Sequence, residues 1–318
     1  MMVKDWQGIR ILAVHAHPDD EAITTGGLLA QAVARGATAT VVTCTLGEEG
    51  EVIGEPMQQL VVDEADQLGG YRYFELVAAL AELGVNGADH QPVLLGGVGH
   101  FRDSGMAGSA AHDKPRALVN AGDRAVAELV QVLRDYQPQI VVTYAPDGGY
   151  GHPDHIAAHR MTHAAVAQLV AEAAISDTAD AYAPQRIYWT ITSQQRQDAA
   201  LADLDTIPEQ WQRADGQLAA LPETAEDIIF GLDDEAVAAK VAAMRAHATQ
   251  IWIADGLPTR TNPDIAVGQV ADGGHALGMW ALSNRLAQPV MRHEVYRLGF
   301  DASGAESVAD FVEGIARD

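Results

Sequence analysis

Two His-Pro-Asp clusters, each placed directly after an apolar run, constrain the fold of this chain most strongly. Residues 15–21 (His-Ala-His-Pro-Asp-Asp-Glu) follow the run 11–14, and residues 150–155 (Tyr-Gly-His-Pro-Asp-His) follow the run 140–144. Short apolar runs bounded by turn residues are typical of buried strands. Side chains that can bind a metal or transfer a proton therefore occur where two strands should end, and the sequence predicts one site built from both clusters.

The first half of the chain alternates short strand-like runs with longer helical segments. Strands are expected at 10–14, 38–43, 93–95, 140–144 and 186–192, and helices at 21–34, 57–68, 74–83, 124–136 and 153–173. Strands separated by helices imply right-handed crossovers. We therefore predict an α/β fold with a Rossmann-like, mostly parallel sheet flanked by helices, in which ligands bind at the carboxyl ends of the strands.

From about residue 193 the sequence becomes acidic and rich in alanine, with helices expected at 235–248 and 276–286 and a strand at 293–298. The predicted division is a Rossmann-like domain at 1–192 that carries the site and a smaller C-terminal α/β domain at 193–318 that packs against the active-site side. The loop at 96–120 is long and rich in Gly, Ser and Asp, and loops of this length are often functional.

Composition excludes several classes of function. The 318 residues carry a formal charge of −24, which argues against binding nucleic acid or an anionic membrane through a basic face. A single cysteine, Cys44, excludes an intramolecular disulfide and a thiolate zinc cage, and its place in a strand predicts a buried filler. The sequence contains neither an apolar run of membrane-spanning length nor a signal-peptide pattern. A cytoplasmic enzyme is the expectation.

A catalytic zinc site needs about three nitrogen or oxygen ligands and one open position. His17 and Asp20 can converge at a loop-to-helix turn, and His155 can supply a third ligand from the other strand end. Two histidines and one carboxylate fit Zn²⁺ and also the facial geometry that binds Fe²⁺, with one ion per subunit. His159 and His163 follow His155 at helical spacing and offer alternative ligands.

The remaining polar groups of the clusters suit acid–base chemistry. Asp19, next to Asp20, is the natural general base for water at the metal. His152 is the candidate general acid or oxyanion stabiliser, with Asp154 orienting it, and Tyr150 can donate a hydrogen bond to an oxyanion. A structural alternative is that Asp19 or Asp20 only caps the helix that follows.

These residues resemble the metal-dependent N-acetylglucosaminyl deacetylase superfamily, whose marks are a His-Pro-Asp-Asp segment and a distant His-Pro-Asp-His segment. Within it, the chain is similar to the actinobacterial deacetylases of mycothiol biosynthesis, which remove acetate from N-acetylglucosaminyl-inositol. Further matching stretches are residues 43–54, 66–72, 102–108, 247–250 and 281–284. The two metal-binding motifs are shared by the whole superfamily, whereas the loops between them are more specific.

The resemblance implies a role for each matching residue. The metal ligands would be His17, Asp20 and His155, and the catalytic groups would be Asp19, His152, Asp154 and Tyr150. Arg72 and Asp103 match positions that bind sugar and inositol hydroxyls, Glu51 and Met106 match loop positions near the substrate, and Thr24 replaces a shorter hydroxyl residue. The implied partner is a small amino-sugar inositol, and a homo-oligomer is compatible with it.

Three other functions stay open. The sister family, the mycothiol S-conjugate amidases, shares the metal site but cleaves a cysteinyl amide, and its loops differ from residues 47–54 and 102–108. A deacetylase of another N-acetylglucosaminyl substrate is the second. The third is a non-catalytic Rossmann-like binding protein. Against the third, the first strand-to-helix turn carries carboxylates in place of a Gly-x-Gly-x-x-Gly run, and these would repel a pyrophosphate.

Overall fold

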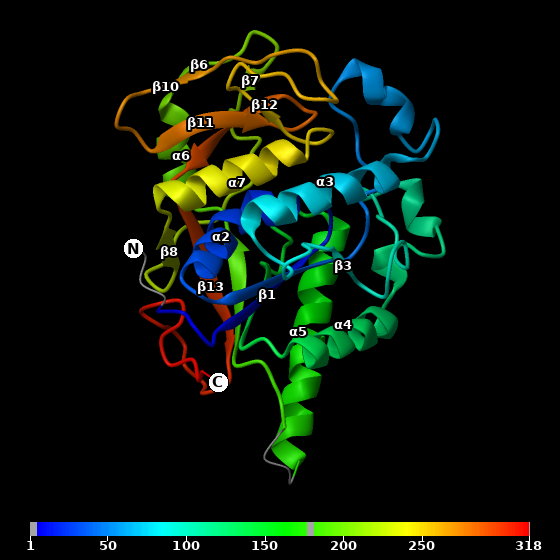
Figure 1. The fold of residues 1–318 in the computed structure, drawn as a ribbon, viewed down its shortest axis with the longest axis vertical. Coiled ribbons are helices and arrows are strands. Elements are labelled where there is room, and N and C mark those ends of the chain that lie inside the picture. The colour runs from blue at the N-terminus through cyan, green and yellow to red at the C-terminus, as the bar shows by residue number, and fades with distance from the viewer. Residues whose placement is uncertain (1–4, 177–180, 318) are drawn as a thin grey trace.

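A seven-stranded sheet forms the centre of the molecule, in a computed structural model that describes residues 5–176 and 181–317. Its strand order is β3-β2-β1-β4-β5-β13-β8. Figure 1 labels β3, β1, β13 and β8 of this sheet. The first five strands are parallel: β3 (Val93–Leu94), β2 (Thr38–Thr43), β1 (Arg10–His15), β4 (Ile140–Tyr144) and β5 (Arg186–Ile191). β13 (His293–Asp301) and β8 (Ile228–Gly231) follow in antiparallel pairing. The predicted α/β class with a mostly parallel sheet is confirmed.

Helices cover both faces of this sheet, because successive residues of its buried strands point to opposite sides. Ile11 and Ala13 of β1 pack in a core shared with α2 (Gly26–Ala34), α3 (Leu68–Leu83) and α7 (Asp234–Ala246). Leu12 and Val14 pack in a second core with α4 (Asp123–Tyr136) and α5 (Pro153–Ile175). The short α1 (Asp20–Thr24) follows β1 after the turn at residues 16–19.

A second, smaller sheet has the order β7-β12-β11-β9. It is built from β7 (Gln212–Arg213), β12 (Leu286–Met291), β11 (Ala276–Ala281) and β9 (Trp252–Ile253). α6 (Gln194–Ala202) and the pair β6 (Leu204–Thr206) and β10 (Gln269–Val270) adjoin it, around a core that includes Trp211, Trp252 and Met279. Short 3₁₀ helices occur at η1 (Glu55–Leu60), η2 (Ala110–Asp113) and η3 (Leu118–Asn120).

Two of the predicted helices are wrong. Residues 276–281 form strand β11, which pairs with β9 and β12, so sheet pairing overrides the helical preference of alanine, leucine and methionine. The segment 57–68 begins as the 3₁₀ turn η1 and continues as turns, because η1 has no buried residue and so no apolar face to pack. The expected helix at 21–34 is divided at Thr25 into α1 and α2.

The C-terminal part contributes to both sheets. β8 and β13 extend the main sheet beside β5, whereas β7, β9, β11 and β12 form the second sheet. Whether residues 193–318 fold as a unit of their own stays a prediction.

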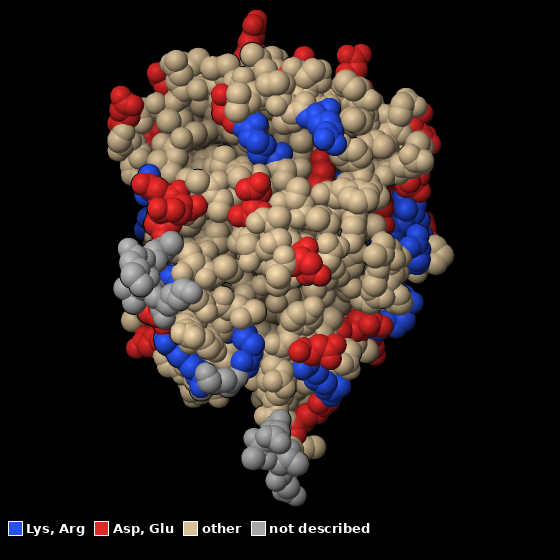
Figure 2. Space-filling view, in the orientation of Figure 1, with Lys and Arg blue, Asp and Glu red and all other residues tan. Residues whose placement is uncertain are grey.

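In the face that Figure 2 shows, lysine and arginine side chains lie in small separate groups among acidic ones. Among the described residues, every helix is too short or too polar to cross a membrane.

Candidate functional site

The candidate site lies at the carboxyl ends of β1 and β4, which are adjacent parallel strands. The sheet order reverses between them, since β2 follows on one side and β5 on the other, and such a switch point is where open α/β sheets bind ligands. The His17 ring centre lies 4.6 Å from that of His152 and 5.3 Å from that of His155. The two clusters therefore meet, as their positions after strands predicted.

One hydrogen bond of His155 determines which of its ring nitrogens keeps a lone pair that could bind a metal. Its Nδ1 lies 3.0 Å from the carbonyl oxygen of Gly148, which can only accept, so Nδ1 carries the proton. The opposite nitrogen, Nε2, is buried without a hydrogen-bond partner in the described part of the chain and lies 3.4 Å from Asp20 Oδ2. A lone pair that points at a carboxylate oxygen is the arrangement expected where both bind one cation.

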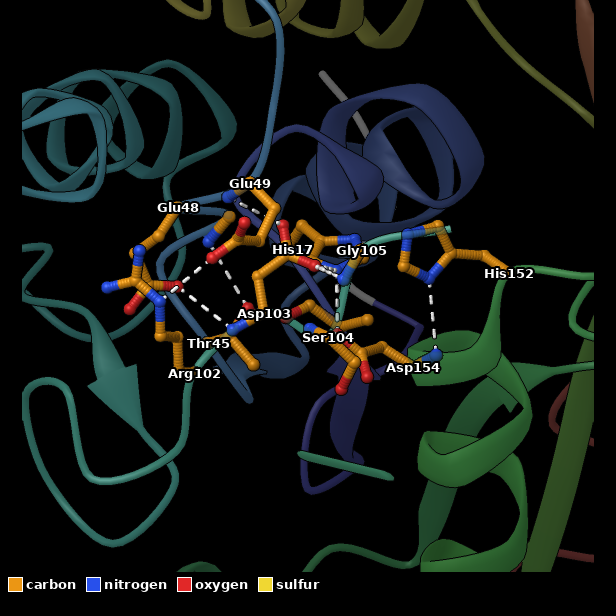
Figure 3. Close-up of polar contacts among 12 residues, drawn as sticks. His17, Thr45, Glu48, Glu49, Arg102, Asp103, Ser104, Gly105, His152 and Asp154 are labelled. Carbon is orange, nitrogen blue, oxygen red and sulfur yellow. Dashed lines mark hydrogen bonds and ion pairs between the residues drawn. The ribbon is translucent and has the colours of Figure 1, made fainter. Parts of the chain in front are cut away.

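His17 shows the same division between its two nitrogens. Its Nε2 lies 3.3 Å from Asp154 Oδ2 and 3.5 Å from Asp103 Oδ1 (Figure 3). Its Nδ1 lies 3.5 Å from Asp20 Oδ2. A carboxylate on one imidazole nitrogen favours the tautomer that presents the other as a ligand. The nearby Asp103 outweighs the effect of burial and raises the pKa of His17.

Asp20 is fixed by two donors. Its Oδ2 accepts hydrogen bonds from the backbone N–H of His17 (3.0 Å) and from the hydroxyl of Tyr144 (2.7 Å). Although burial opposes ionisation, His155 and then His17 hold the pKa of the Asp20 carboxyl well below its usual range. Tyr144 was not among the predicted site residues, because in the sequence it is only the last residue of an apolar strand. The sequence signal that could have identified Tyr144 is its position at the end of the strand that precedes the second cluster.

The donor set fits a metal ion. The ligand atoms of His17, His152 and His155 lie within 4.8 Å of one another, as do those of His17, Asp103 and Asp154. All of these residues are buried, and the unpartnered Nε2 of His155 faces them. Imidazole nitrogens with carboxylate oxygens suit Zn²⁺ and Fe²⁺ equally well.

Asp19 sits at the N-cap of α1 with φ 118° and ψ −33°, and its side chain makes no capping hydrogen bond. Its carboxylate instead lies 3.1 Å from Nη2 of Arg72. Burial raises the pKa of Asp19 to about 6, against the opposing charge of Arg72. A carboxyl with a pKa near neutral can exchange a proton at working pH. The capping alternative therefore does not describe Asp19.

The second cluster begins α5. His152 is the N-cap, and its Nδ1 accepts the backbone N–H of Asp154 at 3.2 Å. The Asp154 carboxylate, which we expected to orient His152, instead accepts from the backbone N–H of Ser104 at 2.9 Å and faces His17. Burial, reinforced by the nearby His17, lowers the pKa of His152 to about 3. Tyr150 is 56% exposed, with its ring centre 5.0 Å from that of His155.

The five predicted substrate contacts lie in different surroundings. Arg72 is buried on α3 and donates to the carbonyl oxygens of Pro18 and Gly47 as well as to Asp19. Asp103 is buried beside His17 and accepts from the backbone N–H groups of Gly105 and Glu49 (Figure 3).

The other three are more exposed. Glu51 lines a cavity of about 670 Å³ together with Glu49, Trp252, Asn262 and Arg285. Met106 is 52% exposed on its loop. The Thr24 hydroxyl donates to the carbonyl oxygen of Asp20 within α1.

His159 and His163, the alternative metal ligands, form hydrogen bonds with other groups. His159 Nδ1 lies 2.9 Å from the carbonyl oxygen of Tyr144, and His163 Nε2 accepts from the Trp189 indole at 2.8 Å. These two ring nitrogens are therefore already engaged by hydrogen bonds of their own. Cys44 is buried in the core below the site, and burial raises the pKa of its thiol, as expected for a core filler.

Comparison with known proteins agrees with this geometry. The family model of GlcNAc-PI de-N-acetylase (PIG-L) matches residues 12–166, which include both clusters. A 1D-myo-inositol 2-acetamido-2-deoxy-alpha-D-glucopyranoside deacetylase of Corynebacterium glutamicum is 48% identical over 315 residues, covering 99% of each chain. Its namesake from Corynebacterium efficiens is 50% identical over 296 residues, covering 93% of this chain and 89% of the relative.

Among solved structures, a triple mutant of a deacetylase of the teicoplanin biosynthetic pathway is 21% identical, with a TM-score of 0.46. The match covers 75% of this chain and 81% of that one. This likeness is too low to bear on function. Family membership follows from the high identity to the Corynebacterium proteins, which extends over most of this chain and of each relative. The chain therefore belongs to the GlcNAc-PI de-N-acetylase family, among relatives named 1D-myo-inositol 2-acetamido-2-deoxy-alpha-D-glucopyranoside deacetylases.

Proposed function

We propose that this protein is a metal-dependent hydrolase that removes acetate from 1D-myo-inositol 2-acetamido-2-deoxy-α-D-glucopyranoside, giving the free amine for mycothiol biosynthesis. The observation that carries the proposal is the convergence of His17, Asp20 and His155 beside the buried Asp19, at the switch point of the sheet. Relatives of this name share 48–50% identity over most of the chain.

His17, Asp20 and His155 would bind the metal, one ion per subunit, as Zn²⁺ or Fe²⁺. The hydrogen-bonding pattern supports this choice, because each histidine has one nitrogen engaged by an oxygen and the other near Asp20 Oδ2. When bound, such an ion lowers the pKa of water and polarises a carbonyl oxygen. Asp154 would then act on His17 rather than on His152, by holding its Nε2–H.

Asp19 would take the proton from the attacking water. Its carboxylate is not used for capping, so both oxygens are available to Arg72 and to a substrate. The pKa of about 6 supports this role, because a base that is mostly ionised at neutral pH can still hold a proton for a short time. Arg72 keeps the carboxylate in place.

The second cluster would serve the oxyanion and the leaving amine. His152 and Tyr150 lie with their ring centres 6.0 Å apart, on the side of His155. A phenol has an ordinary pKa of about 10, so Tyr150 is protonated at neutral pH and can donate a hydrogen bond. We assign Tyr150 to the oxyanion. His152 is neutral at working pH because its pKa is about 3, and its Nδ1 accepts the Asp154 N–H, so its Nε2–H can donate to the same oxyanion. Delivery of a proton to the amine is its alternative role.

The sugar and inositol hydroxyls would bind along the loops that carry Asp103, Met106 and Glu51, and Thr24 would be a further contact. The 670 Å³ cavity beside Glu51 is lined largely by polar side chains, as a hydroxylated ligand requires. The single cysteine leaves no intramolecular disulfide, which suits a reducing compartment, so we propose the cytoplasm as the place of action.

The test is a side-by-side assay on N-acetylglucosaminyl-inositol and on a mycothiol S-conjugate, with and without chelator. We expect a strong preference for the acetylated glycoside and loss of activity in chelator, restored by added Zn²⁺ or Fe²⁺. A preference for the conjugate would instead assign the protein as an amidase. Activity that survives chelation would contradict the metal site. As a further check, His17→Ala should lose bound metal.

A further inference from the structure

The backbone of Asp19 adopts a conformation that costs free energy. Its φ of 118° lies in the region that favours glycine, and a non-glycine residue there costs on the order of 1–3 kcal/mol. Such a conformation persists only where neighbouring groups fix it. Arg72 contacts the Asp19 side chain and the carbonyl oxygen of the Pro18–Asp19 peptide. The N–H of that peptide has a different partner.

The partner of this N–H is Glu21, two residues along the chain. Glu21 Oε2 accepts the backbone N–H of Asp19 at 3.0 Å. Its other oxygen, Oε1, lies 2.5 Å from Nε2 of His247. Both side chains are fully buried, and together they connect the first catalytic turn to a residue more than 200 positions away.

His247 is fixed in turn by its own segment. It is the C-cap of α7 and opens the turn 247–250, whose Thr249 donates from its backbone N–H (2.8 Å) and hydroxyl (2.6 Å) to Glu75. Glu75 lies on α3, one helical turn after Arg72. Arg72 thus binds the Asp19 carboxylate and the Pro18 carbonyl oxygen. Glu75 connects, through the turn and Glu21, to the Asp19 N–H.

The charges agree with a stable pair. Burial alone would lower the pKa of His247, but the facing Glu21 outweighs it and raises that pKa. An ionised or strongly polarised carboxylate accepts a backbone N–H more tightly than a neutral acceptor does.

We propose that Glu21 and His247 form a positioning pair that holds the Asp19 peptide in its left-handed conformation, so that the Asp19 carboxylate is aimed at the attacking water. The proposal rests on the role of Asp19 under the proposed function. It assigns a task to the segment 247–250, which lies far from both His-Pro-Asp clusters in the sequence.

The first test is a pair of substitutions at Glu21. Glu21→Gln introduces an amide whose oxygen can accept the Asp19 N–H and whose NH₂ can face His247, whereas Glu21→Met introduces a side chain of similar length with no such acceptor. We expect Glu21→Gln to keep kcat within about threefold and Glu21→Met to lose roughly 10- to 100-fold, since small misplacements of a catalytic group cost about that much. KM and metal content should stay near wild type. Equal kcat in both variants would overturn the proposal.

The second test asks whether the pair acts through Asp19. His247→Gln should lower kcat by roughly 10- to 100-fold in the wild-type background and leave the residual rate of Asp19→Ala unchanged. His163→Gln, the same exchange at a histidine bound to Trp189, is the matched control and should leave kcat unchanged. Equal losses in both backgrounds would mean that His247 acts on the fold as a whole and would overturn the inference.

The outcomes separate this inference from the proposed function. If Asp19→Ala alone keeps wild-type activity, the proposed base is wrong and the positioning pair falls with it. If Asp19→Ala is inactive while His247→Gln and Glu21→Met are fully active, only the positioning pair is wrong. Should His247→Gln fail to fold, the two variants of Glu21 decide alone, because they differ in the acceptor and little in volume.

Discussion

The two His-Pro-Asp turns share a motif and a position after parallel strands, yet they are built differently. The first is closed: Asp19, Asp20 and Glu21 are buried, and their carboxylates contact Arg72, Tyr144 and His247. The second is more open, with three left-handed glycines at 148, 149 and 151 around the exposed Tyr150. The difference indicates that the first turn fixes groups in place, whereas the second can admit a substrate.

The largest expected effect comes from the closed turn. Asp19→Ala should keep its bound metal and lose a factor on the order of 10² to 10⁴ in kcat, the usual contribution of a positioned base. Steady-state kinetics and elemental analysis of the purified variant measure both quantities. A turnover number near wild type would remove Asp19 from the role of base, and loss of metal would make it a ligand.

A pair of glycine variants examines the open turn. A Cβ on Gly148 would lie 2.8 Å from Cβ of His155, whereas one on Gly149 would meet no atom within 4 Å, although both residues have positive φ. Gly149→Ala should cost about 1–2 kcal/mol of stability. Gly148→Ala should cost more and also weaken metal binding, because it displaces His155. Thermal unfolding with and without metal distinguishes them, and identical behaviour would show that the turn relaxes freely.

Tyr150→Phe removes a hydroxyl from the open turn without changing its packing. We expect a loss of about 10- to 100-fold in kcat with little change in stability, since an oxyanion donor acts mainly in the transition state. Measuring kcat and KM of the variant and the wild type on the acetylated glycoside tests this expectation. A rise in KM at constant kcat would place the hydroxyl in ground-state binding instead.

The smallest effect concerns α5, the helix that starts at the open turn. His163 accepts from Trp189 through a lone pair that protonation removes, and burial, followed by His159, lowers the pKa of His163 to about 4. Between pH 6.5 and 4 the unfolded chain therefore binds more protons than the folded one, so stability falls as the pH falls. His163→Gln can still accept but does not titrate. Because the side chain is only half-buried, we expect a moderate effect. Between pH 7 and 5, the free energy of unfolding of the wild type should fall by about 1 kcal/mol more than that of the variant, as measured by denaturant titrations. If the free energies of unfolding of the two proteins changed equally with pH, the result would contradict this role of His163.

The sequence predicts much of this site because its main signals are local. An apolar run followed by His-Pro-Asp identifies a strand end, and the carboxyl ends of neighbouring parallel strands meet at one edge. That reasoning correctly brought residues 17–20 and 152–155 together. The roles assigned to the individual side chains stay predictions.

Long-range pairing escaped the same reasoning. Nothing near Glu21 in the sequence indicates that its partner is His247. Likewise, nothing near residues 276–281 indicates that this segment pairs with β9 and β12. The positive φ of Asp19 is also invisible in the sequence, because only tertiary contacts make it tolerable. Asp154 was assigned to the neighbouring His152, although its side chain turns to His17 from the other strand.

The place of β13 in the sheet has a consequence for synthesis of the protein. β13 pairs along β5 from residue 295 to 301, and it is the last strand of the described chain. Until the ribosome has released this segment, β5 remains an edge strand with unpaired N–H and C=O groups, open to other chains. A nascent chain stopped before residue 293 should therefore be prone to aggregate, although both His-Pro-Asp turns have already been made.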